Sequence, residues 1–493
     1  MCYNEGIDYP KGETIMKIVE KANALGLFAK DATPNSRQLE WYSRERMMFI
    51  HFGMNTFTDK EWGDGTEDPA IFNPSELDCR QWIRAVKAAG FRSAVLTAKH
   101  HDGFCLWPSK YTEHSVKNSP YKNGKGDIVR EFTDACREYG IKAGIYLSPW
   151  DRHEATYGTG EEYNTYFKNQ LTELATKFGD IFCFWFDGAC GEGKNGKKQV
   201  YDWNSYFEII RELQPNAVIN ICGPDVRWCG NEAGKSRESE WSVVPAFVGN
   251  QDYTAEHSQQ EDNPEFAKKV DAKTQDLGSR EFIDGIKHFI WYPAEVDVSI
   301  RPGWFYHKRE DFKVKSLKKL MQIYWGSVGG NSSLLLNIPP DKNGLIAKAD
   351  VRALRKFGDE LRKEFPENLV KDCVISASSQ LDDENSAENI LTENGYWQCG
   401  VGDEKPEITI EFKTPIVADK IVLKENIATG QQIESFDVYG DSGKGYEKLC
   451  SSTVIGAKRI CRFKKQKLNS LKIVITSYRV KATLNKVELY CKK

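Results

Sequence analysis

The stretch DIFCFWFDG, residues 180–188, decides the fold. An uninterrupted apolar run of strand length lies between Asp180 and Asp187, and Gly188 follows it. A strand without polar alternation is typical of a parallel sheet that is covered on both faces. The stretch therefore predicts a buried parallel strand that delivers one carboxylate, Asp187, into a turn opened by glycine.

Similar runs recur on both sides of this stretch. Further strand candidates are MFIHFG (48–53), SAVLTAK (93–99), KAGIYLS (142–148), AVINIC (217–222), SEWSVV (239–244), HFIWYP (288–293) and SLLLNI (333–338). Amphipathic helical patterns lie between many of them, at 79–90, 127–140, 163–179 and 203–215, and end at Gly or Pro. Eight strands with intervening helices predict an α/β fold, a closed (β/α)8-type barrel. Strands six and seven fall in or beside an irregular region, and a doubly wound open sheet is the alternative.

The pattern changes towards the C-terminus. A helical stretch covers 346–365, and beyond it alternating β patterns are split by Gly, Asp and Asn turns. That spacing predicts an antiparallel β-sandwich. We therefore expect four parts: an N-terminal extension (1–39), the barrel (40–345), a helical link (346–370) and the sandwich (371–493).

Composition limits the partners of this 493-residue chain. Its 68 basic and 71 acidic residues give a net charge of −3, which is no electrostatic footprint for nucleic acid. No apolar run is long enough to span a membrane. Residues 1–10 show no signal peptide, and the compartment stays open, periplasmic or secreted if a signal was removed. The sequence does not specify an oligomeric state.

Polar side chains follow the first four strand candidates. His51 follows the first, His100 and His101 the second, Tyr146 lies at the end of the third, and Asp187 ends the fourth. In a parallel barrel these positions meet at one rim. We expect the side chains of the adjacent His100 and His101 to leave their strand on opposite faces. An unpaired buried acid is unfavourable, so Asp187 is a better candidate for a nucleophile or general base than for a helix cap.

Several classes of chemistry lack their motifs. The 13 cysteines include no C-x-x-C pair, and neither an H-E-x-x-H helix nor a G-x-S-x-G elbow is present. P-loop and G-x-G-x-x-G patterns are absent at the strand–helix junctions. We predict no cofactor and no metal, although the spacing of His51, His100 and Asp187 is compatible with a mononuclear site. The remaining option is a pair of carboxyl groups, as in glycosidases. Glu232 on a Gly-rich loop is the preferred second acid, and Glu238 and Glu240 are the alternatives.

Seven ordered motifs resemble glycoside hydrolase family 29, the α-L-fucosidases. They are HFGMNTF (51–57), EWGDG (61–65), TAKHHDGFCLWPS (97–109), GIYLSPWDRH (144–153), FWFDGA (184–189), WYPAEVDVSIRPGWFYH (291–307) and GGNSSLLLNIPPDKNG (329–344). The resemblance implies a retaining mechanism with Asp187 as the nucleophile. The substrate would be fucosylated oligosaccharides or glycoconjugates. The motifs also imply sugar-binding roles for His51, Glu61, Trp62, His100, His101, Tyr146, Trp185 and Trp291.

The acid/base position differs between branches of this family. The GNEAG and SEWSVVP segments and the 291–307 motif resemble the branch selective for α-1,3/1,4-linked fucose, in which the acid/base matches Glu232. Glu240 is the fallback. Alternatives are another exo-glycosidase, a broad or α-1,2-acting fucosidase, a catalytically silent fucose-binding barrel, and a metal-dependent hydrolase.

The C-terminal part resembles a discoidin or factor 5/8 type module. The resemblance rests on NGYWQCG (394–400), PEITIEF (406–412) and ADKIVLKENI (418–427). Such modules bind carbohydrate in some proteins and only pack against the barrel in others. We expect the packing role here, because the link offers no Gly/Ser-rich tether.

Overall fold

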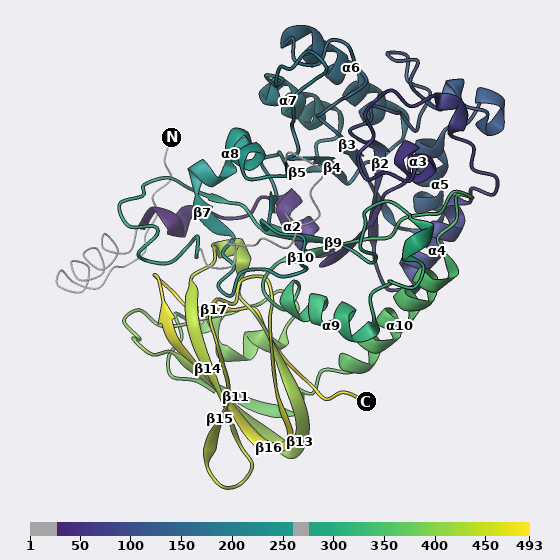
Figure 1. The fold of residues 1–493 in the computed structure, drawn as a ribbon. Helices are drawn as coiled ribbons and strands as arrows, with labels where there is room; N and C mark the ends of the chain where they lie inside the picture. The colour runs from purple at the N-terminus through teal and green to yellow at the C-terminus, as the bar shows by residue number, and fades with distance from the viewer. Residues whose placement is uncertain (1–26, 260–275) are drawn as a thin grey trace.

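The computed structural model describes residues 27–259 and 276–493, and it contains a parallel barrel joined to an antiparallel β-rich unit (Figure 1). Within these residues the barrel sheet runs in the order β5-β4-β3-β2-β1-β10-β9-β6, with every pairing parallel. Its strands are β1 (Arg46–Ile50), β2 (Ser93–Lys99), β3 (Lys142–Leu147), β4 (Cys183–Phe186), β5 (Val218–Ile221), β6 (Arg227–Trp228), β9 (Ala294–Ser299) and β10 (Ser333–Asn337). A parallel bridge between Asn220 and Val226 links the two edge strands and nearly closes the barrel. The predicted fold class is confirmed.

Helices cover the outside of the barrel. Those that follow the first strands are α4 (Cys79–Ala88), α5 (Ile128–Tyr139), α6 (Glu161–Lys177) and α7 (Trp203–Leu213). The side chains of Asp78, Asp127 and Asp202 accept backbone N–H bonds at the starts of α4, α5 and α7, which satisfies donors that the helix leaves unpaired. Among the helices of the described ranges, none is long and apolar enough to cross a membrane.

The predictions for strands six and seven are wrong. The segments 239–244 and 288–293 supply β7 (Val243–Pro245) and β8 (Phe289–Trp291), which form an antiparallel ribbon separate from the barrel sheet. The barrel positions belong instead to β6 and β9. Strand β6 has only two residues, and β9 carries the buried acids Glu295 and Asp297, so neither forms the uninterrupted apolar run that indicates a buried parallel strand.

Two more helices complete the barrel wall. They are α9 (Leu317–Gly326) and α10 (Lys348–Glu364), close to the predicted helical link. Helix α10 contacts both α4 and α9. A Cβ at Gly358 would come within 2.8 Å of the Ala89 backbone, so glycine permits close approach of α10 to the end of α4. The link is therefore packed against the barrel along its length.

The C-terminal unit is an antiparallel sandwich with its own apolar core. Its main strands are β11 (Cys373–Ala377), β13 (Glu407–Lys424), β14 (Ile433–Asp441), β15 (Tyr446–Ser452), β16 (Arg459–Tyr478) and β18 (Lys486–Tyr490), and a short pair joins β12 (Trp397–Gln398) to β17 (Thr483–Leu484). Register shifts interrupt the long β13–β16 pairing between Glu411 and Ile416 and again between Ala418 and Lys420. Such irregularities bend strands.

Buried contacts join the sandwich to the barrel. Val454 packs with Trp241, Val244 and Tyr292 in one apolar cluster. The Arg479 guanidinium lies 3.7 Å from the centroid of the Trp241 ring. The two units therefore share a packed interface.

Candidate active site

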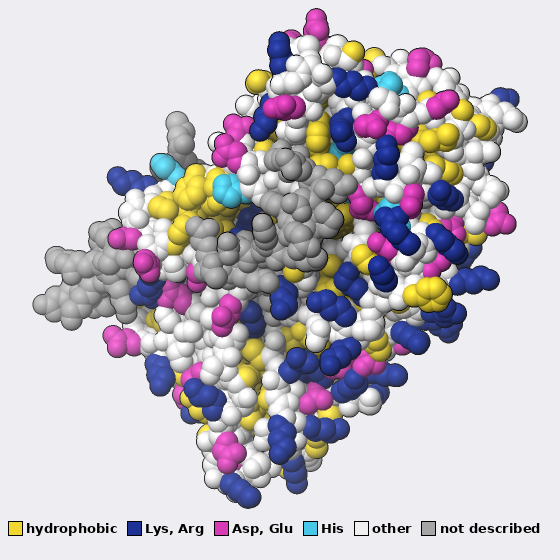
Figure 2. Space-filling view, viewed as in Figure 1, with side chains coloured by type: hydrophobic (Ala, Val, Ile, Leu, Met, Phe, Trp, Pro, Cys, Tyr) yellow, Lys and Arg dark blue, Asp and Glu magenta, His cyan; other side chains and the backbone are white. Residues whose placement is uncertain are grey.

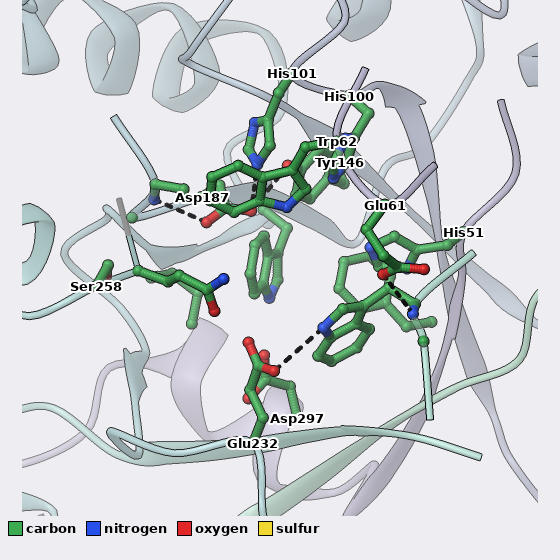
Figure 3. A pocket seen from close by; sticks show the side chains of 18 of the residues that line it. His51, Glu61, Trp62, His100, His101, Tyr146, Asp187, Glu232, Ser258 and Asp297 are labelled. Carbon is green, nitrogen blue, oxygen red and sulfur yellow. Dashed lines mark hydrogen bonds and ion pairs between the residues drawn. The ribbon is translucent and has the colours of Figure 1, made fainter. Parts of the chain in front are cut away.

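The carboxyl ends of the barrel strands surround a pocket of about 290 Å³ (Figure 3). Side chains that follow different strands reach it because parallel strands end at the same rim. Nine of the ten site residues predicted from the sequence line it: His51, Glu61, Trp62, His100, His101, Tyr146, Trp185, Asp187 and Glu232. The tenth, Trp291, does not.

Asp187 lies one residue beyond β4 and is held by two donors. The Tyr146 hydroxyl donates to its Oδ2 at 2.8 Å, and the Ala189 N–H donates to its Oδ1 at 2.9 Å. Burial raises the pKa of Asp187 above its ordinary value, and these two hydrogen bonds oppose the rise because they favour the charged form. The arrangement orients a carboxylate towards the pocket.

His51 and His101 are neutral and have defined tautomers. Asn337 Oδ1 is 2.8 Å from His51 Nδ1, and that oxygen can only accept, so Nδ1 carries the proton. Ser148 Oγ donates to the Trp150 carbonyl at 2.6 Å and therefore accepts from His101 Nδ1 at 2.7 Å. Burial lowers the pKa of each histidine to about 3. Both keep an unprotonated Nε2 that can accept from a hydroxyl group.

His100 and His101 both line the pocket, which corrects the expectation that they point to opposite faces. Strand β2 ends at Lys99, so the alternation of a strand no longer applies to the two histidines. Their ring centroids are 4.1 Å apart. Trp62 packs edge-on against His101 with centroids 5.0 Å apart, which adds an apolar wall beside the polar ones.

Glu61 organises a distant loop as well as lining the pocket. Its carboxylate accepts from the Trp304 and Phe305 N–H groups at 2.8 and 3.2 Å. It also lies 2.6 Å from Nε2 of His307, which contacts Asp59 through its other nitrogen. Burial alone would lower the pKa of His307, but Glu61 and Asp59 raise it above its ordinary value. Glu61 therefore fixes the position of Trp304.

Glu232 lies on the loop after β6, on the opposite side of the pocket from Asp187 (Figure 3). The Trp304 indole N–H donates to its Oε2 at 3.2 Å. Burial raises the pKa of Glu232 to about 7, and the negative charges of Asp187 and Glu61 add to the rise. A carboxyl group in this state can both donate and accept a proton near neutral pH.

Sequence reasoning missed the acidic face of β9. Asp297 lines the pocket and accepts from the Trp228 indole at 2.7 Å, and Glu295 accepts from the Trp185 indole at 2.8 Å. Burial raises the pKa of Glu295 to about 7, and burial and the charge of Glu232 raise that of Asp297. The signal was the spacing of two acids at alternate positions within AEVDVS (294–299), which places both on one face of a strand.

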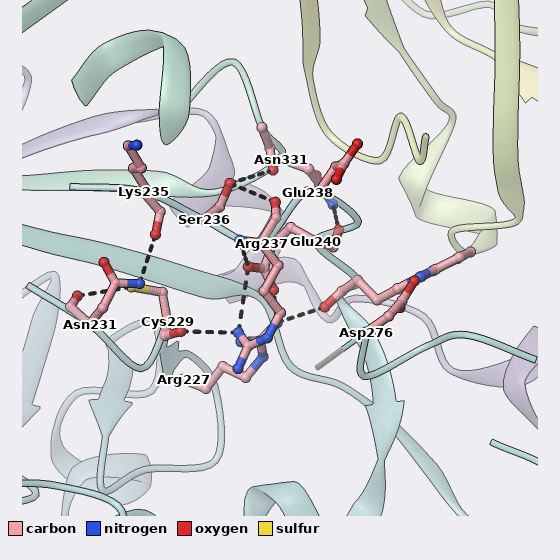
Figure 4. Close-up of polar contacts among 12 residues, drawn as sticks. Arg227, Cys229, Asn231, Lys235, Ser236, Arg237, Glu238, Glu240, Asp276 and Asn331 are labelled. Atoms are coloured by element: carbon pink, nitrogen blue, oxygen red, sulfur yellow. Dashed lines mark hydrogen bonds and ion pairs between the residues drawn. The ribbon is translucent and has the colours of Figure 1, made fainter. Parts of the chain in front are cut away.

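The structure separates Glu232 from the fallback, Glu240. Glu240 does not line the pocket, and its carboxylate pairs with Arg227 and accepts from the Arg237 N–H at 2.9 Å (Figure 4). Burial would raise its pKa, but the two arginines hold it below the ordinary value. Glu238 contacts the sandwich instead, where its carbonyl accepts from Thr453 Oγ1 at 2.8 Å.

Trp291 lies on β8, outside the pocket. It packs in a small cluster with Ala29, Ala32 and Val243. Its sequence neighbour Tyr292 is also buried, with its hydroxyl bonded to the Gly223 carbonyl at 2.7 Å. The position of Trp291 does not support the sugar-binding role that the resemblance implied.

No cluster of three or more His, Cys, Asp or Glu side chains arranged to hold a metal ion occurs within residues 27–259 and 276–493. The side chains of Asn337, Asn55 and Ser148 are within hydrogen-bonding distance of the three pocket histidines, His51, His100 and His101, in that order.

Comparisons with known proteins give one consistent result. The model of the family described as Alpha-L-fucosidase matches residues 24–364. The chain is 40% identical to Alpha-L-fucosidase 1 of Arabidopsis thaliana in an alignment 472 residues long, which covers 93% of this chain and 88% of that one.

Solved structures agree over nearly the whole length. The crystal structure of an alpha-L-fucosidase, so described, from Bacteroides ovatus superposes with a TM-score of 0.83. Its sequence is 43% identical to this chain, and the match covers 99% of this chain and 78% of that one. A GH29 fucosidase of Ruminococcus gnavus, solved in complex with fucose, is 30% identical, with a TM-score of 0.79 and coverage of 94% and 95%. The likeness therefore includes both the barrel and the C-terminal unit.

Proposed function

The chain belongs to the α-L-fucosidases of glycoside hydrolase family 29, and we propose that it releases α-1,3/1,4-linked L-fucose from branched glycans with retention of configuration. The observation that carries the proposal is the pair formed by Asp187 and Glu232. Two carboxyl groups lie on opposite sides of one pocket, and their surroundings differ. Such a pair fits the division of labour in a glycosidase.

Asp187 is the proposed nucleophile. Its carboxylate attacks the anomeric carbon of fucose while the bond to the leaving oxygen breaks, and a covalent fucosyl ester forms. The donors Tyr146 and Ala189 support this role because they hold the carboxylate charged and oriented.

Glu232 is the proposed acid/base. It gives its proton to the leaving oxygen in the first step, and the resulting carboxylate takes a proton from water in the second step. That water attacks the ester, releases fucose and returns Asp187 to its charged form. A pKa of about 7 suits both directions of transfer.

The proposed fucose site uses neutral polar groups and one apolar wall. His51 and His101 accept from ring hydroxyls through Nε2, and His100 lines the same pocket. Trp62 provides the surface for the C6 methyl group of this deoxy sugar. Neutral histidines suit a neutral substrate, because no charged group has to be desolvated on binding.

The linkage preference rests on the side of the pocket that faces the leaving group. The motifs that resemble the α-1,3/1,4-selective branch supply the Glu232 loop, the acids of β9 and the loop that carries Trp304. These groups would surround a branched leaving group.

Two measurements test the proposal. The rate of fucose release from a branched Lewis-type trisaccharide is compared with that from a linear 2′-fucosylated trisaccharide, and we expect a preference of at least about tenfold for the branched substrate, equivalent to ~1.4 kcal/mol. Proton NMR of the first product distinguishes retention from inversion. Faster release from the linear sugar would reject the linkage, and a β-fucose product would reject the mechanism.

A further inference from the structure

A row of four rings leads away from the pocket. Three belong to helix α8 (Gln251–Glu256), its C-cap and the preceding turn η5 (Ala246–Gly249), and the fourth, Phe282, comes from the segment that precedes β8. His257 stacks on Tyr253 with centroids 4.0 Å apart and an interplanar angle of 27°. Tyr253 lies edge-on to Phe247 at 6.2 Å, and Phe247 lies 6.4 Å from Phe282. The four rings form one continuous group, which we call the ring row.

The ring row begins at the wall of the pocket. Ser258 follows His257 and lines the pocket together with Gln259. A Cβ at Gly188 would come within 1.9 Å of Ser258 Oγ, so the end of α8 packs directly against the residue after Asp187. The first ring therefore stands one residue from the pocket wall.

Two rings of the ring row are exposed, and the other two, Tyr253 and Phe282, are partly buried. Phe247 keeps 50% of its surface exposed, and His257 is exposed. Figure 2 shows a hydrophobic patch in this region, over α8 and β7, with histidine side chains at its edge. Below it, Phe282 and Ile290 pack on the buried cluster of Trp241 and Val244, which gives the row a fixed base.

The chemistry of the ring row matches the apolar faces of sugar rings. Flat, partly exposed aromatic side chains offer large contact area with little conformational freedom to lose. An exposed apolar patch beside a binding pocket is typical of an extended binding site. Asp252, Glu256 and His257 are available at the edge to bond sugar hydroxyls.

We propose that the ring row is a distal carbohydrate subsite, which binds sugar residues of the leaving glycan beyond those that fit the pocket. This inference rests on the proposed function, because the sugar chain must enter with its fucose at Asp187. The ring row is continuous with the pocket wall through Ser258, which packs on Gly188. A glycan whose fucose occupies the pocket can therefore extend onto the rings, and this favours a glycan over a second copy of the chain as the occupant.

Three substrates of increasing length test the subsite: an aryl fucoside, a Lewis-type trisaccharide and the same trisaccharide extended by two sugars. In Phe247→Leu the apolar contact to Phe282 is kept but the flat ring is lost. We expect kcat/KM for the extended substrate to fall about fivefold to tenfold, mainly through KM, as for the loss of one stacking contact. The other two substrates should change less than about twofold.

Phe312→Ala is the matched control, because Phe312 is a fully exposed ring outside the ring row and contacts no other ring within residues 27–259 and 276–493. It should leave all three substrates unchanged. An equal loss on the aryl fucoside in Phe247→Leu would assign the ring to folding of the site and overturn the proposal. No loss on any substrate would overturn it as well.

A binding experiment separates this inference from the proposed function. Titration of the chain with the extended glycan lacking fucose, followed by NMR, needs no turnover. We expect weakened binding in Phe247→Leu and in Tyr253→Ala, even if fucose release followed another linkage preference. Unchanged binding in both variants, or sedimentation showing that they dissociate a dimer, would assign the patch elsewhere.

Discussion

The Tyr146 hydroxyl donates a hydrogen bond to Oδ2 of Asp187 at 2.8 Å. Tyr146 comes from β3 and Asp187 from the end of β4, and the paired strands bring the two groups together. Because Tyr146 is fully buried, its donor position is fixed by packing. The bond favours the charged form of Asp187, which is the form that attacks.

Tyr146→Phe should therefore slow the reaction without unfolding the protein. A hydrogen bond to a charged group contributes roughly 1.5–3 kcal/mol, so we expect kcat/KM to fall by about tenfold to a hundredfold. Loss of the donor also raises the pKa of Asp187, so the acidic limb of the pH profile should move to higher pH. A profile with unchanged position would show that this bond does not tune the nucleophile.

Asp187→Ala should reduce turnover to below about 1% of the wild-type rate, because the covalent ester cannot form. Azide can take the place of the missing carboxylate, so its addition should restore part of the activity and yield fucosyl azide. The thermal transition of the variant, followed by circular dichroism, controls for folding. More than a few per cent residual activity without azide would exclude Asp187 as the nucleophile.

Glu232→Ala should depend on the leaving group. Natural glycans need a proton on the departing oxygen, whereas an aryl fucoside with an acidic phenol does not, so the glycan rate should fall by at least about a hundredfold more. Glu240→Gln is the control, since Glu240 pairs with Arg227 away from the pocket. It should lower stability and affect both substrates alike. If only Glu240→Gln showed leaving-group dependence, Glu240 and not Glu232 would be the acid/base.

The pH profile of glycan hydrolysis should be bell-shaped. Glu232 must be protonated in the first step, and its pKa is about 7, so kcat/KM should decline above about pH 7. Asp187 must be charged, and burial raises its pKa, so activity should be lost on the acidic side at a pH above the ordinary aspartate value of about 3.9. Glu232→Ala assayed with an activated aryl fucoside should lose the basic limb. A basic limb that persists there would belong to another group.

The sequence predicts the pocket residues at the ends of strands, because an apolar run marks each strand and the position where the run stops marks its end. His51, Tyr146 and Asp187 each follow or end an apolar run, and parallel strands bring their ends together. The same pattern does not predict Asp297, whose polar side chain interrupts the apolar run of β9. A strand whose acidic side chains face the pocket lacks the continuous apolar pattern of a buried strand.

The sequence pattern alone does not distinguish the roles of Glu232 and Glu240. Both lie in one irregular segment, and only the positions of Arg227 and Arg237 beside Glu240 make that acid an ion-pair partner. Trp304 is fixed by Glu61, which lies 243 residues away along the chain. Contacts between residues so far apart in the sequence depend on the assembled barrel and leave no local periodicity in the sequence.

Removal of the sandwich by truncation near Pro366 should give an unstable, aggregation-prone barrel. Trp241, Val244 and Tyr292 would lose their contact with Val454 and be exposed to water, and the Ser242 N–H would lose its 2.7 Å bond to Gln431. Arg280→Ala is the matched control, because it removes only partly exposed polar contacts across the same interface. These are an ion pair with Glu434, worth about 0–1 kcal/mol, and hydrogen bonds to the Tyr478 carbonyl and the Ser477 hydroxyl. Light scattering during heating measures the aggregation of the truncated barrel and of Arg280→Ala. A soluble truncated barrel with normal activity on aryl fucosides and weaker binding to branched glycans would instead assign the sandwich a carbohydrate-binding role.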